Sequence, residues 1–243
     1  MTLPVFLVSS LPSGSEFVLD GPEGRHAATV RRLRVGEELL LSDGSGVLAR
    51  CSVVAVERDS LALKVLERAE EPPASPRVVL AQALVKGDRG ELAVELATEA
   101  GVDGVVPWRA ARCITKWEDG PRGAKALGRW RSTVREAAKQ ARRSRVPFVD
   151  EPVSTAQLSQ RVSSSALTLV LHESATDRLA DVPLPVDGDV LLVVGPEGGI
   201  TPEELEVLRS SGARIVRLGP TVLRASTAAA VALGALGVLT SRW

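Results

Sequence analysis

Cysteine, histidine and aromatic residues are all scarce in this chain. Among its 243 residues there are two cysteines, two histidines and no tyrosine, and aromatic residues make up 3% of the total. Cys51 and Cys113 cannot build a disulfide framework, and together with His26 and His172 they supply too few ligands for a structural zinc site. We therefore predict no metal and a reduced, cytoplasmic setting. The few aromatic side chains also argue against a protein that binds single strands by base stacking.

Long apolar runs are missing as well. The most apolar stretch, Thr227–Leu239, is rich in alanine and glycine and too short to span a bilayer, so we predict a buried helix there. The N-terminal residues lack both a basic start and a sustained apolar core, so no signal peptide is predicted. With 44% hydrophobic and 25% charged residues, the chain is typical of one large or two small globular domains.

Neither sign of charge is in excess, but the charge is unevenly distributed. Thirty basic and thirty acidic residues give a formal net charge of zero, so no global field attracts the chain to nucleic acid. Residues 122–145, however, carry nine lysines and arginines and a single acid, Glu136. Four of the basic residues fall in one narrow stripe of a helix: Arg131, Arg135, Lys139 and Arg142. The stripe adjoins an apolar face: Trp130, Val134, Ala138 and Ala141. Because solvated helix faces normally mix charges, we interpret the stripe as a surface for RNA phosphates, with a solvated face as the alternative.

A proline-rich linker divides the chain. Glu70–Pro76 holds three prolines and otherwise only small or charged residues, so it has nothing to pack. Upstream of it, short strand-like runs follow one another, and Asp43–Gly46 supplies a turn with positive φ between two of them. A short helix is predicted around His26–Leu33. We therefore expect an all-β module over residues 1–71 and a second domain over residues 77–243.

Downstream of the linker, strands and helices alternate. Strands are predicted at Val78–Leu84, Gly104–Trp108, Ala166–His172, Asp189–Val194 and Ala213–Leu218. Helices are predicted between Asp88 and Gly101, over Ala124–Arg143, between Thr201 and Ser211, and over Ser226–Leu239. Two of these helices begin with capping-box spacing, at Asp88 with Glu91 and at Thr201 with Glu204. The alternation predicts an α/β domain with a mostly parallel sheet and helices on both faces.

The first candidate binding element is a glycine-rich loop after a buried strand. Val190–Val194 runs into Gly195-Pro196-Glu197-Gly198-Gly199, at the sheet edge where open α/β folds bind ligands. Glycines there let backbone N–H and C=O groups approach a ligand closely. No Lys-Ser/Thr pair follows and no G-x-G-x-x-G pattern is present, which argues against a P-loop and against a nicotinamide dehydrogenase. A tight turn that only leads into a capped helix is the alternative interpretation.

Two further strand ends offer candidate site residues. After the strand that ends at Leu218, Gly219 begins a second glycine loop, and Arg224 stands just before the last helix in an apolar neighbourhood. An arginine there needs an anionic or carbonyl partner, because an unpaired buried charge is costly. His172 and Glu173 end another strand, so we predict that the three strand ends line one pocket. No Ser/His/Asp order, metal cluster or carboxylate pair is evident.

A series of short motifs runs along nearly the whole chain. The N-terminal part holds His26, Val30-Arg31-Arg32-Leu33-Arg34 and Gly36-Glu37. The centre holds Lys86-Gly87-Asp88, Glu95, Thr98-Glu99, Gly101-Val102, Arg112-Cys113, Lys116-Trp117, Arg129-Trp130, Glu136 to Gln140 and Arg142-Arg143. The C-terminal part holds Gly195–Gly199 and Leu223-Arg224 with Thr227-Ala228. In this order they resemble the RsmE family, the 16S ribosomal RNA uracil-N3 methyltransferases of the SPOUT superfamily.

The resemblance implies a fold and a cofactor. It implies an α/β protein with an N-terminal PUA-like, RNA-binding β-barrel over residues 1–71. The C-terminal SPOUT domain over residues 77–243 would be tied in a deep trefoil knot, bind S-adenosylmethionine and form a homodimer. The implied cofactor site comprises Leu171, His172, Glu173, Val194, Gly195, Pro196, Glu197, Gly198, Gly199, Leu218, Gly219, Val222, Leu223, Arg224, Thr227 and Ala228. Many family members have glutamate where this chain has Ser226, so no role carries over to that side chain.

The implied reaction is methylation of a uridine at N3 in 16S ribosomal RNA, in the decoding region of the small subunit. Uracil N3 carries a proton in neutral water, so transfer requires removal of that proton and stabilisation of the charge that develops on the ring. Arg224 is the predicted electrostatic catalyst, and Glu197 is the second candidate, for contacting substrate or accepting the proton. The expected RNA contacts are His26, Arg31, Arg32, Arg34, Arg131, Arg135, Lys139, Arg142 and Arg143. The expected partner is the assembled small subunit, with no membrane.

Two other functions stay open at this point. One is a non-catalytic RNA-binding protein with a vestigial pocket, although the retained glycine loops and Arg224 argue against such decay. The other is a methyltransferase of the same superfamily that acts on another RNA, such as transfer RNA. Calorimetry with S-adenosylmethionine separates the first alternative from an enzyme, because a pure RNA binder gives no heat with the cofactor.

Overall fold

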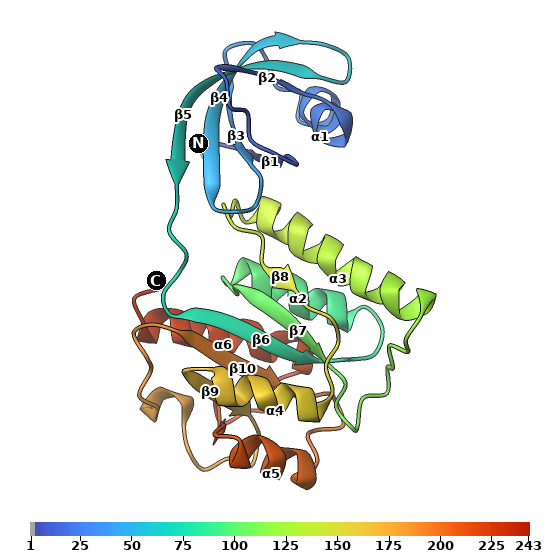
Figure 1. Ribbon diagram of the computed structural model, residues 1–243, viewed down its shortest axis with the longest axis vertical. Coiled ribbons are helices and arrows are strands. Elements are labelled where there is room, and N and C mark those ends of the chain that lie inside the picture. The colour runs from blue at the N-terminus through green and yellow to red at the C-terminus, as the bar shows by residue number, and fades with distance from the viewer. Residues whose placement is uncertain (1–2) are drawn as a thin grey trace. The chain divides into compact units, whose positions relative to one another are not determined.

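The computed structural model describes residues 3–243, which fold as two compact units (Figure 1). The first unit contains the chain up to Pro73 together with Ala138–Val146. The second unit contains Ala74–Ala137 and Pro147–Trp243. Each unit has a sheet of its own, so each is described separately.

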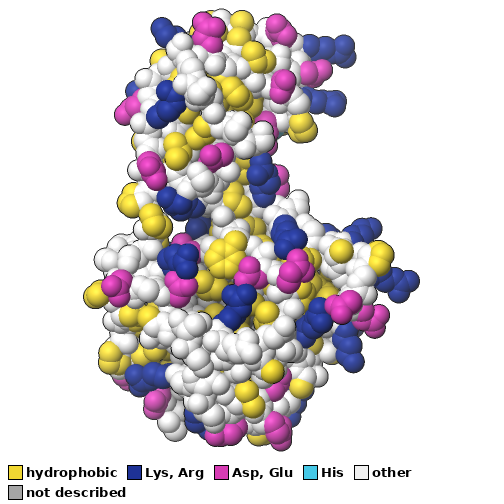
Figure 2. Space-filling view, in the orientation of Figure 1, with side chains coloured by type: hydrophobic (Ala, Val, Ile, Leu, Met, Phe, Trp, Pro, Cys, Tyr) yellow, Lys and Arg dark blue, Asp and Glu magenta, His cyan; other side chains and the backbone are white. Residues whose placement is uncertain are grey.

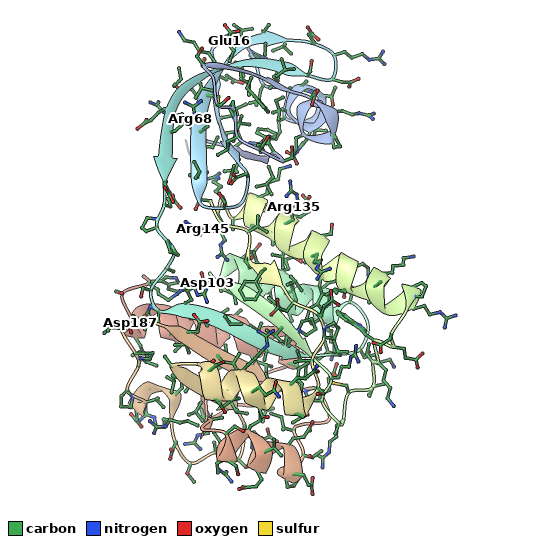
Figure 3. The ribbon with its side chains drawn as sticks, in the orientation of Figure 1. Glu16, Arg68, Asp103, Arg135, Arg145 and Asp187 are labelled. Carbon is green, nitrogen blue, oxygen red and sulfur yellow. The ribbon has the colours of Figure 1, made fainter. Side chains whose placement is uncertain are left out.

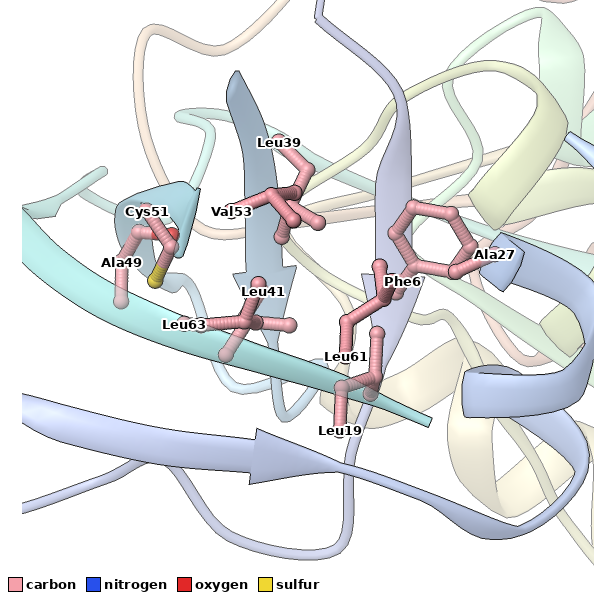
Figure 4. Packing of buried hydrophobic residues seen from close by; sticks show 10 residues of the cluster. All are labelled: Phe6, Leu19, Ala27, Leu39, Leu41, Ala49, Cys51, Val53, Leu61 and Leu63. Carbon is pink, nitrogen blue, oxygen red and sulfur yellow. The ribbon is translucent and has the colours of Figure 1, made fainter. Parts of the chain in front are cut away.

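Among the described residues, the first unit is built on a five-stranded sheet. Its strands are β1 (Val5–Leu7), β2 (Glu16–Leu19), β3 (Glu38–Ser42), β4 (Val47–Val56) and β5 (Leu61–Glu70). They are ordered β1-β3-β4-β5-β2, with β1 parallel to β3 and the other neighbours antiparallel. The core of the unit packs against this sheet and includes Phe6, Leu41 and Leu63 (Figure 4). The expected all-β module is confirmed, but the short edge strands β1 and β2 do not pair, so the sheet is an open half-barrel where a closed barrel is expected.

The turn between β3 and β4 forms as the sequence predicts. Gly44 and Gly46 have positive φ angles of 82° and 110°, a region that glycine adopts without steric cost. Oδ1 of Asp43 accepts a hydrogen bond from the backbone N–H of Ser45 at 2.8 Å. Hydrogen bonds from the side chain and then the backbone of Ser45 lower the pKa of the Asp43 carboxyl. The turn therefore fixes the register of the two strands that it joins.

The helical segment before β3 begins earlier than predicted. Helix α1 covers Gly21–Arg25 and continues as one π-helical segment, η1 (His26–Val30). The sequence predicts this helix over His26–Leu33. Pro22 in the first turn favours the earlier start, because its missing N–H is not needed there. Arg32 has a positive φ of 55°, which ends the helix before Leu33.

The second unit, as described, contains a six-stranded sheet in which every pairing is parallel. Its strands are β6 (Arg77–Ala83), β7 (Gly104–Trp108), β8 (Phe148–Val149), β9 (Leu167–Leu171), β10 (Asp189–Val194) and β11 (Arg214–Val216). They are ordered β11-β9-β10-β6-β7-β8. The parallel sheet inferred from strand–helix alternation is confirmed. Strand β8 was not predicted, because two residues carry no periodicity.

The helices of the second unit cover both faces of this sheet. They are α2 (Arg89–Glu99), α3 (Pro121–Gln140), α4 (Thr155–Ser164), α5 (Pro202–Ser210) and α6 (Ala225–Leu239), with a short 3₁₀ turn, η2 (Leu179–Asp181), between β9 and β10. Helix α2 packs against α6, and α4 packs against α5 on the opposite face (Figure 1). The last residues of α3 belong to the first unit. Helix α4 was not predicted, although Ser154 caps it with a complete capping box.

One of the two predicted capping boxes forms in the structure, and the other does not. Oγ1 of Thr201 accepts the N–H of Glu204 at 3.2 Å, and Oε2 of Glu204 accepts the N–H of Thr201 at 3.2 Å, as predicted. The capping box expected at Asp88 does not form, because Asp88 has φ −75° and ψ 0° and not the extended conformation of an N-cap residue. Glu91 pairs with Arg129 at 2.9 Å instead.

Helix α6 is the buried helix predicted at Thr227–Leu239. Ala229 and Ala232 on its inner face are fully buried. On its outer side Val231 and Val238 remain 49% and 73% exposed. The helix is therefore apolar on more sides than this chain covers. No helix among the described residues is long and apolar enough to cross a membrane.

The end of the chain is fastened to the start of the second unit. Nη1 of Arg242 pairs at 2.8 Å with Asp103, which Figure 3 labels, and donates to the carbonyl of Pro76 at 2.6 Å. Oδ2 of Asp103 also accepts the N–H of Val78, in β6, at 2.7 Å. The two charged side chains are only 9% and 16% exposed. The last residues thus stabilise the beginning of the sheet.

The division into units differs from the sequence expectation at one place. The linker Glu70–Pro76 lies between β5 and β6, as predicted. Residues 138–146, however, belong to the first unit although they lie far downstream of the linker. The hydroxyl of Ser42 donates to the carbonyl of Ser144 at 2.9 Å, one of the contacts that hold this segment. Such a contact joins residues about a hundred positions apart, so no local pattern reveals it.

Candidate functional site

Three strand ends meet at one edge of the sheet in the second unit. Strands β11, β9 and β10 are neighbours and parallel, so their carboxyl ends lie at the same edge. The segments that follow them begin at Arg217, His172 and Gly195. In open α/β sheets, ligands bind at this edge. The sheet order, which places β9 between the other two strands, brings the three predicted segments together.

A cavity of about 730 Å³ opens at this edge. It is lined by every predicted cofactor residue except Thr227: Leu171, His172, Glu173, Val194, Gly195, Pro196, Glu197, Gly198, Gly199, Leu218, Gly219, Val222, Leu223, Arg224 and Ala228. Thr227 lies in the first turn of α6, where its hydroxyl donates to the carbonyl of Arg224 at 3.2 Å. Residues from three separate loops therefore form one concave site.

Close packing requires glycine in the loop after β10. A Cβ on Gly195 would lie 2.6 Å from Cγ1 of Ile200, and Gly199 has a positive φ of 74°. The N–H of Gly199 donates to the carbonyl of Pro196 at 2.9 Å, which closes the turn. The loop therefore passes tightly over Ile200 before α5 begins, and its backbone forms part of the cavity wall.

Three arginines that line the cavity were not among the predicted site residues: Arg89, Arg112 and Arg217. Nη1 of Arg112 donates to the carbonyl of Gly198 at 3.0 Å. A Cβ on Gly198 would lie 3.1 Å from Cβ of Arg112, so glycine lets the arginine pass closely. The available signal was the position of Arg112 shortly after β7, because parallel strands all end at this edge.

A buried carboxylate holds the loops behind the cavity. Glu204 is 6% exposed, and its Oε1 accepts the N–H of Ala111 at 2.9 Å and the hydroxyl of Thr155 at 2.8 Å. Its Oε2 accepts the N–H of Thr201 at 3.2 Å. One side chain thus joins the starts of α4 and α5 to the loop that carries Arg112. The predicted capping box therefore has a second role, which the spacing alone does not reveal.

Glu197 and His172 reach the cavity from different loops. Oε1 of the exposed Glu197 accepts the backbone N–H of Lys86 at 3.2 Å, which joins the loop after β10 to the loop after β6. Nδ1 of His172 accepts the N–H of Ser174 at 3.3 Å and lies 2.9 Å from its Oγ. Glu197 therefore presents a positioned carboxylate, whereas His172 is engaged by its own loop.

Arg224 is exposed, contrary to the apolar setting expected from the sequence. It precedes α6 with an extended backbone, and its carbonyl accepts the N–H of Ala228 at 3.0 Å. Arg224 lines the cavity, and its side chain forms no ion pair within residues 3–243. The argument from a buried charge is therefore wrong. The position at the cavity, next to Ala228 and Leu223, is what makes Arg224 a candidate.

Neither cysteine qualifies as a nucleophile. Burial raises the pKa of Cys113, which lies shortly after β7, to about 11. Burial likewise raises the pKa of Cys51, in the core of the first unit, to about 11. Because the thiolate is the reactive form of cysteine, both side chains are inert thiols at neutral pH. Chemistry at the cavity must come from the other side chains.

The basic stripe is shorter than its periodicity predicts. Trp130 and Val134 are buried, as the apolar face requires. Helix α3 ends before Arg142, which takes a left-handed conformation with φ 57°. The N–H of Arg143 returns to the carbonyl of Ala138 at 2.8 Å, a hydrogen bond typical of helix ends. Arg142 is therefore not part of a helical stripe.

Some predicted RNA contacts are open and others are engaged. Three arginines of the first unit are exposed: Arg31, Arg32 and Arg34. Arg131 instead donates to the carbonyl of Val149 at 3.2 Å and pairs with Glu151 at 3.0 Å. Figure 2 shows basic and acidic side chains interspersed on the face that it presents, in keeping with the neutral total. RNA contacts must therefore be assigned residue by residue.

Lys139 lies in an internal cluster of the first unit. Its ammonium contacts the two oxygens of Glu23 at 2.7 and 2.8 Å, and the two side chains are only 12% and 20% exposed. Nδ1 of His26 lies 3.1 Å from the ammonium, and the ring centroid of Phe6 lies 5.5 Å away. Because an ammonium only donates, Nδ1 of His26 accepts. We therefore leave Lys139 and His26 out of the proposed RNA contacts.

Replacing Lys139 with alanine is expected to destabilise the first unit by about 3 kcal/mol, because Glu23 stays mostly buried without its counter-charge. Amide hydrogen exchange in β1 and α1 should then accelerate about 100-fold. Lys125→Ala, which removes an exposed lysine from the same helix, should leave exchange unchanged. Equal exchange rates in the two variants would show that the buried pair contributes no more than a surface charge.

Two family models match the chain and together cover most of it. An RNA methyltransferase domain matches residues 72–237, which include every residue that lines the cavity. An RNA methyltransferase PUA domain matches residues 19–66, within the open sheet of the first unit.

Relatives are similar over nearly their whole length. The chain is 56% identical to the ribosomal RNA small subunit methyltransferase E of Mycobacterium tuberculosis. The match covers 100% of this chain and 94% of that protein. It is 32% identical to the protein of the same name from Bacillus subtilis, and that match covers 92% of this chain and 90% of the relative.

Solved structures are similar as well. The ribosomal RNA small subunit methyltransferase E from Neisseria gonorrhoeae, bound to S-adenosylmethionine, has a TM-score of 0.84 at 26% identity, with 98% of each chain covered. A protein from Legionella pneumophila in complex with the same cofactor has a TM-score of 0.85 at 30% identity, and the match covers 99% of this chain and 98% of that protein.

Proposed function

The chain belongs to the ribosomal RNA small subunit methyltransferase E family, and from this premise we propose that it transfers a methyl group from S-adenosylmethionine to N3 of a uridine in 16S ribosomal RNA. The target base lies in the decoding region of the small subunit, and the reaction takes place in the cytoplasm, where ribosomes assemble. The observation that carries the proposal is the cavity at the three strand ends, lined by the loop Gly195–Gly199 and by Leu223 and Arg224.

The cavity fits the cofactor in size and in lining. Its volume of about 730 Å³ lies within the range of typical small-molecule sites, about 300–1,000 Å³. Leu171, Val194 and Leu218 supply apolar walls for the adenine ring. The glycine loop after β10 supplies backbone donors and acceptors for the edges of the nucleoside. Bound there, S-adenosylmethionine supplies an electrophilic methyl group.

Two side chains of the cavity are proposed to act on the uracil. The Glu197 carboxylate would accept the proton from N3. The electron pair left on N3 would form the bond to the methyl carbon while the carbon–sulfur bond of the cofactor breaks and leaves its electron pair on sulfur. Arg224 donates hydrogen bonds to the ring oxygens, which carry the negative charge once the proton leaves. A guanidinium suits this task because it stays charged and only donates. Both groups line the cavity, and Lys86 orients Glu197.

The proposed RNA contacts in the first unit are arginines: Arg31, Arg32, Arg34, Arg142 and Arg143. Two of these arginines, Arg32 and Arg142, have positive φ angles of 55° and 57°. Such a conformation costs a residue with a Cβ about 1 kcal/mol, which glycine would avoid. Arg135 of the second unit, which is exposed, completes the set.

The proposal includes the topology and assembly of the family. The second unit would be tied in a trefoil knot formed by the loops after β9, β10 and β11. Two copies would form a homodimer through the second unit, with α6 at the interface. The support is the apolar outer side of α6, where Val231 and Val238 are spaced by two helical turns and exposed.

The double variant Val231→Glu/Val238→Glu is therefore expected to be monomeric. Carboxylates in an apolar interface lose their hydration without gaining partners, so the dimer should dissociate. Multi-angle light scattering at micromolar concentration should give the mass of two chains for the parent and of one chain for the variant. A parent protein that is already monomeric would contradict the proposed assembly.

Transfer of a labelled methyl group tests the proposed function. The purified protein is incubated with methyl-labelled S-adenosylmethionine and with small ribosomal subunits from a strain that lacks this methyltransferase. Label in the 16S RNA is the expected result. Binding of subunits without any heat from the cofactor in calorimetry would instead identify a non-catalytic RNA-binding protein. Label in transfer RNA and not in subunits would identify an enzyme for another RNA.

A further inference from the structure

Arginines without a carboxylate partner gather at the cavity. Elsewhere in the second unit, most arginines are paired with a carboxylate at short distance. Examples are Arg77 with Asp189 at 2.7 Å, Arg161 with Asp150 at 2.6 Å and Arg242 with Asp103 at 2.8 Å. Arg89 and Arg217, in contrast, line the cavity and form no ion pair within residues 3–243. Both are exposed.

The two arginines stand on opposite sides of the cavity. Arg217 directly follows β11, and Arg89 is the first residue of α2, shortly after β6. In the sheet, β9 and β10 lie between these two strands. With a spacing of about 4.8 Å per strand, β11 and β6 are about 14 Å apart. The two arginines therefore approach the cavity from different places along this edge of the sheet.

The remaining lining favours anions. Helices α2, α5 and α6 all begin at the cavity, where Arg89, Pro202 and Ala225 line it. Each helix start carries a partial positive charge from its unpaired N–H groups. Two carboxylates, Glu173 and Glu197, also line the cavity. Neither carboxylate forms an ion pair with Arg89 or Arg217 within residues 3–243.

We propose that Arg89 and Arg217 bind two backbone phosphates of the RNA, one on each side of the nucleotide whose base enters the cavity. The inference rests on the proposed function and specifies how this site holds its substrate. A polynucleotide fits because it carries anions at regular intervals along one chain. The planar fork of a guanidinium matches the oxygens of a phosphate with two parallel hydrogen bonds. Arg89 and Arg217 are therefore positioning residues for the target base.

The carboxylate of the cofactor is the other possible source of an oxyanion at this site. That carboxylate is a single anion, whereas an RNA backbone offers a separate phosphate to each of the two arginines. Arg112 and Arg224 also line the cavity, but Arg112 donates to the carbonyl of Gly198 and Arg224 is assigned to the uracil. The phosphate assignment therefore accounts for both unpaired side chains at once. Cofactor affinity separates the two sources experimentally.

The test compares two double variants with the same change in net charge. Arg89→Gln/Arg217→Gln removes the cavity arginines. Arg178→Gln/Arg209→Gln removes two arginines that are 66% and 59% exposed and do not line the cavity. Binding of small ribosomal subunits is measured over a series of salt concentrations, the KM for subunits and kcat are measured at one of them, and calorimetry gives the affinity for S-adenosylmethionine.

The cavity variant is expected to bind subunits more weakly, with a salt dependence shallower by about 0.7–0.9 per lost phosphate contact. Its KM for subunits should rise while kcat at saturation is largely kept. Its affinity for S-adenosylmethionine should stay within about twofold of the parent's affinity, a difference of less than about 0.5 kcal/mol in binding free energy. The control variant should behave like the parent. Arg89→Lys/Arg217→Lys should keep the salt slope but raise KM, because lysine keeps the charge and loses the fork.

Three outcomes would overturn the proposal. An equal salt slope in the cavity variant and the control would show that Arg89 and Arg217 are only solvated. A fall in cofactor affinity would assign them to the carboxylate of S-adenosylmethionine. If the glutamine variant does not fold, an unchanged KM in the lysine variant would contradict the fork-to-phosphate contact. Absence of methyl transfer by the parent would refute the proposed function but not this inference, because the salt slopes of RNA binding are measured without the reaction.

Discussion

The Gly219→Val variant is expected to bind S-adenosylmethionine about 100-fold more weakly than the parent while staying folded. Gly219 lines the cavity, and a Cβ built on it meets nothing within 4 Å. Its φ lies outside the left-handed region, so valine adds no backbone strain. The added side chain enters the space in which we propose that the cofactor binds. Isothermal titration calorimetry measures the loss, and thermal unfolding shows whether the fold is kept.

Gly14→Val is the matched control for this prediction. A Cβ on Gly14 also meets nothing within 4 Å, but Gly14 lies in the first unit and not at the cavity. A substitution at Gly198 is less informative, because its Cβ would press on Arg112 at 3.1 Å and displace a second wall residue. Equal affinities in Gly219→Val and the parent would show that the cofactor binds elsewhere.

Arg224→Ala is expected to lower kcat by about 10²–10³-fold, the usual effect of removing one donor to a developing oxyanion. Cofactor affinity should change little, because the Arg224 side chain is assigned to the uracil and not to the cofactor. Single-turnover methyl transfer to small subunits measures the rate, and calorimetry measures cofactor binding. Arg224→Lys should recover part of the rate, since a lysine keeps the charge but offers fewer donors.

Arg209→Ala is the control for the loss of one arginine. Arg209 is exposed on α5 and pairs with Glu206 along the helix at 3.2 Å, so its removal should leave the rate unchanged. A kcat of Arg224→Ala equal to that of the control would remove Arg224 from the chemistry. A parallel loss of cofactor affinity and rate would mean that the arginine side chain holds the cofactor and not the uracil.

Features determined by neighbouring residues could be read from the sequence. The bounds of β7 and β10 match the prediction, because each is an apolar run with clear limits. The capping box of Thr201 and Glu204 and the glycine turn at Asp43–Gly46 also form as predicted. In each case the physical cause lies within a few positions of the residue concerned.

Features determined by tertiary packing could not be read in this way. Periodicity places Lys139 on the basic stripe that we interpret as a surface for RNA phosphates. Glu23, more than a hundred positions away, instead pairs with it inside the first unit. Arg89 and Arg112 reach the cavity only because β6 and β7 share the sheet with β10. The order of strands in that sheet follows from packing. The residue pattern within one strand does not indicate which strands lie beside it in the sheet.

The trefoil knot is a feature that only the family resemblance predicts. A general rule states that chains do not thread through loops, so reasoning from strands and helices would exclude such a topology. The expectation of a knot comes only from the resemblance of motifs such as Gly195–Gly199 to a known family. A family resemblance can thus suggest a topology, and site residues with it, that local patterns do not indicate.

Mass mapping of 16S ribosomal RNA tests the central claim most directly. Small subunits from a strain lacking this methyltransferase are incubated with the purified protein and S-adenosylmethionine, and the RNA is then digested and its fragments are analysed by tandem mass spectrometry. The account predicts one added methyl group, at N3 of a single uridine in the decoding region, and none with the Gly219→Val variant. A methyl group on another base, or on carbon or ribose oxygen of the uridine, would contradict it.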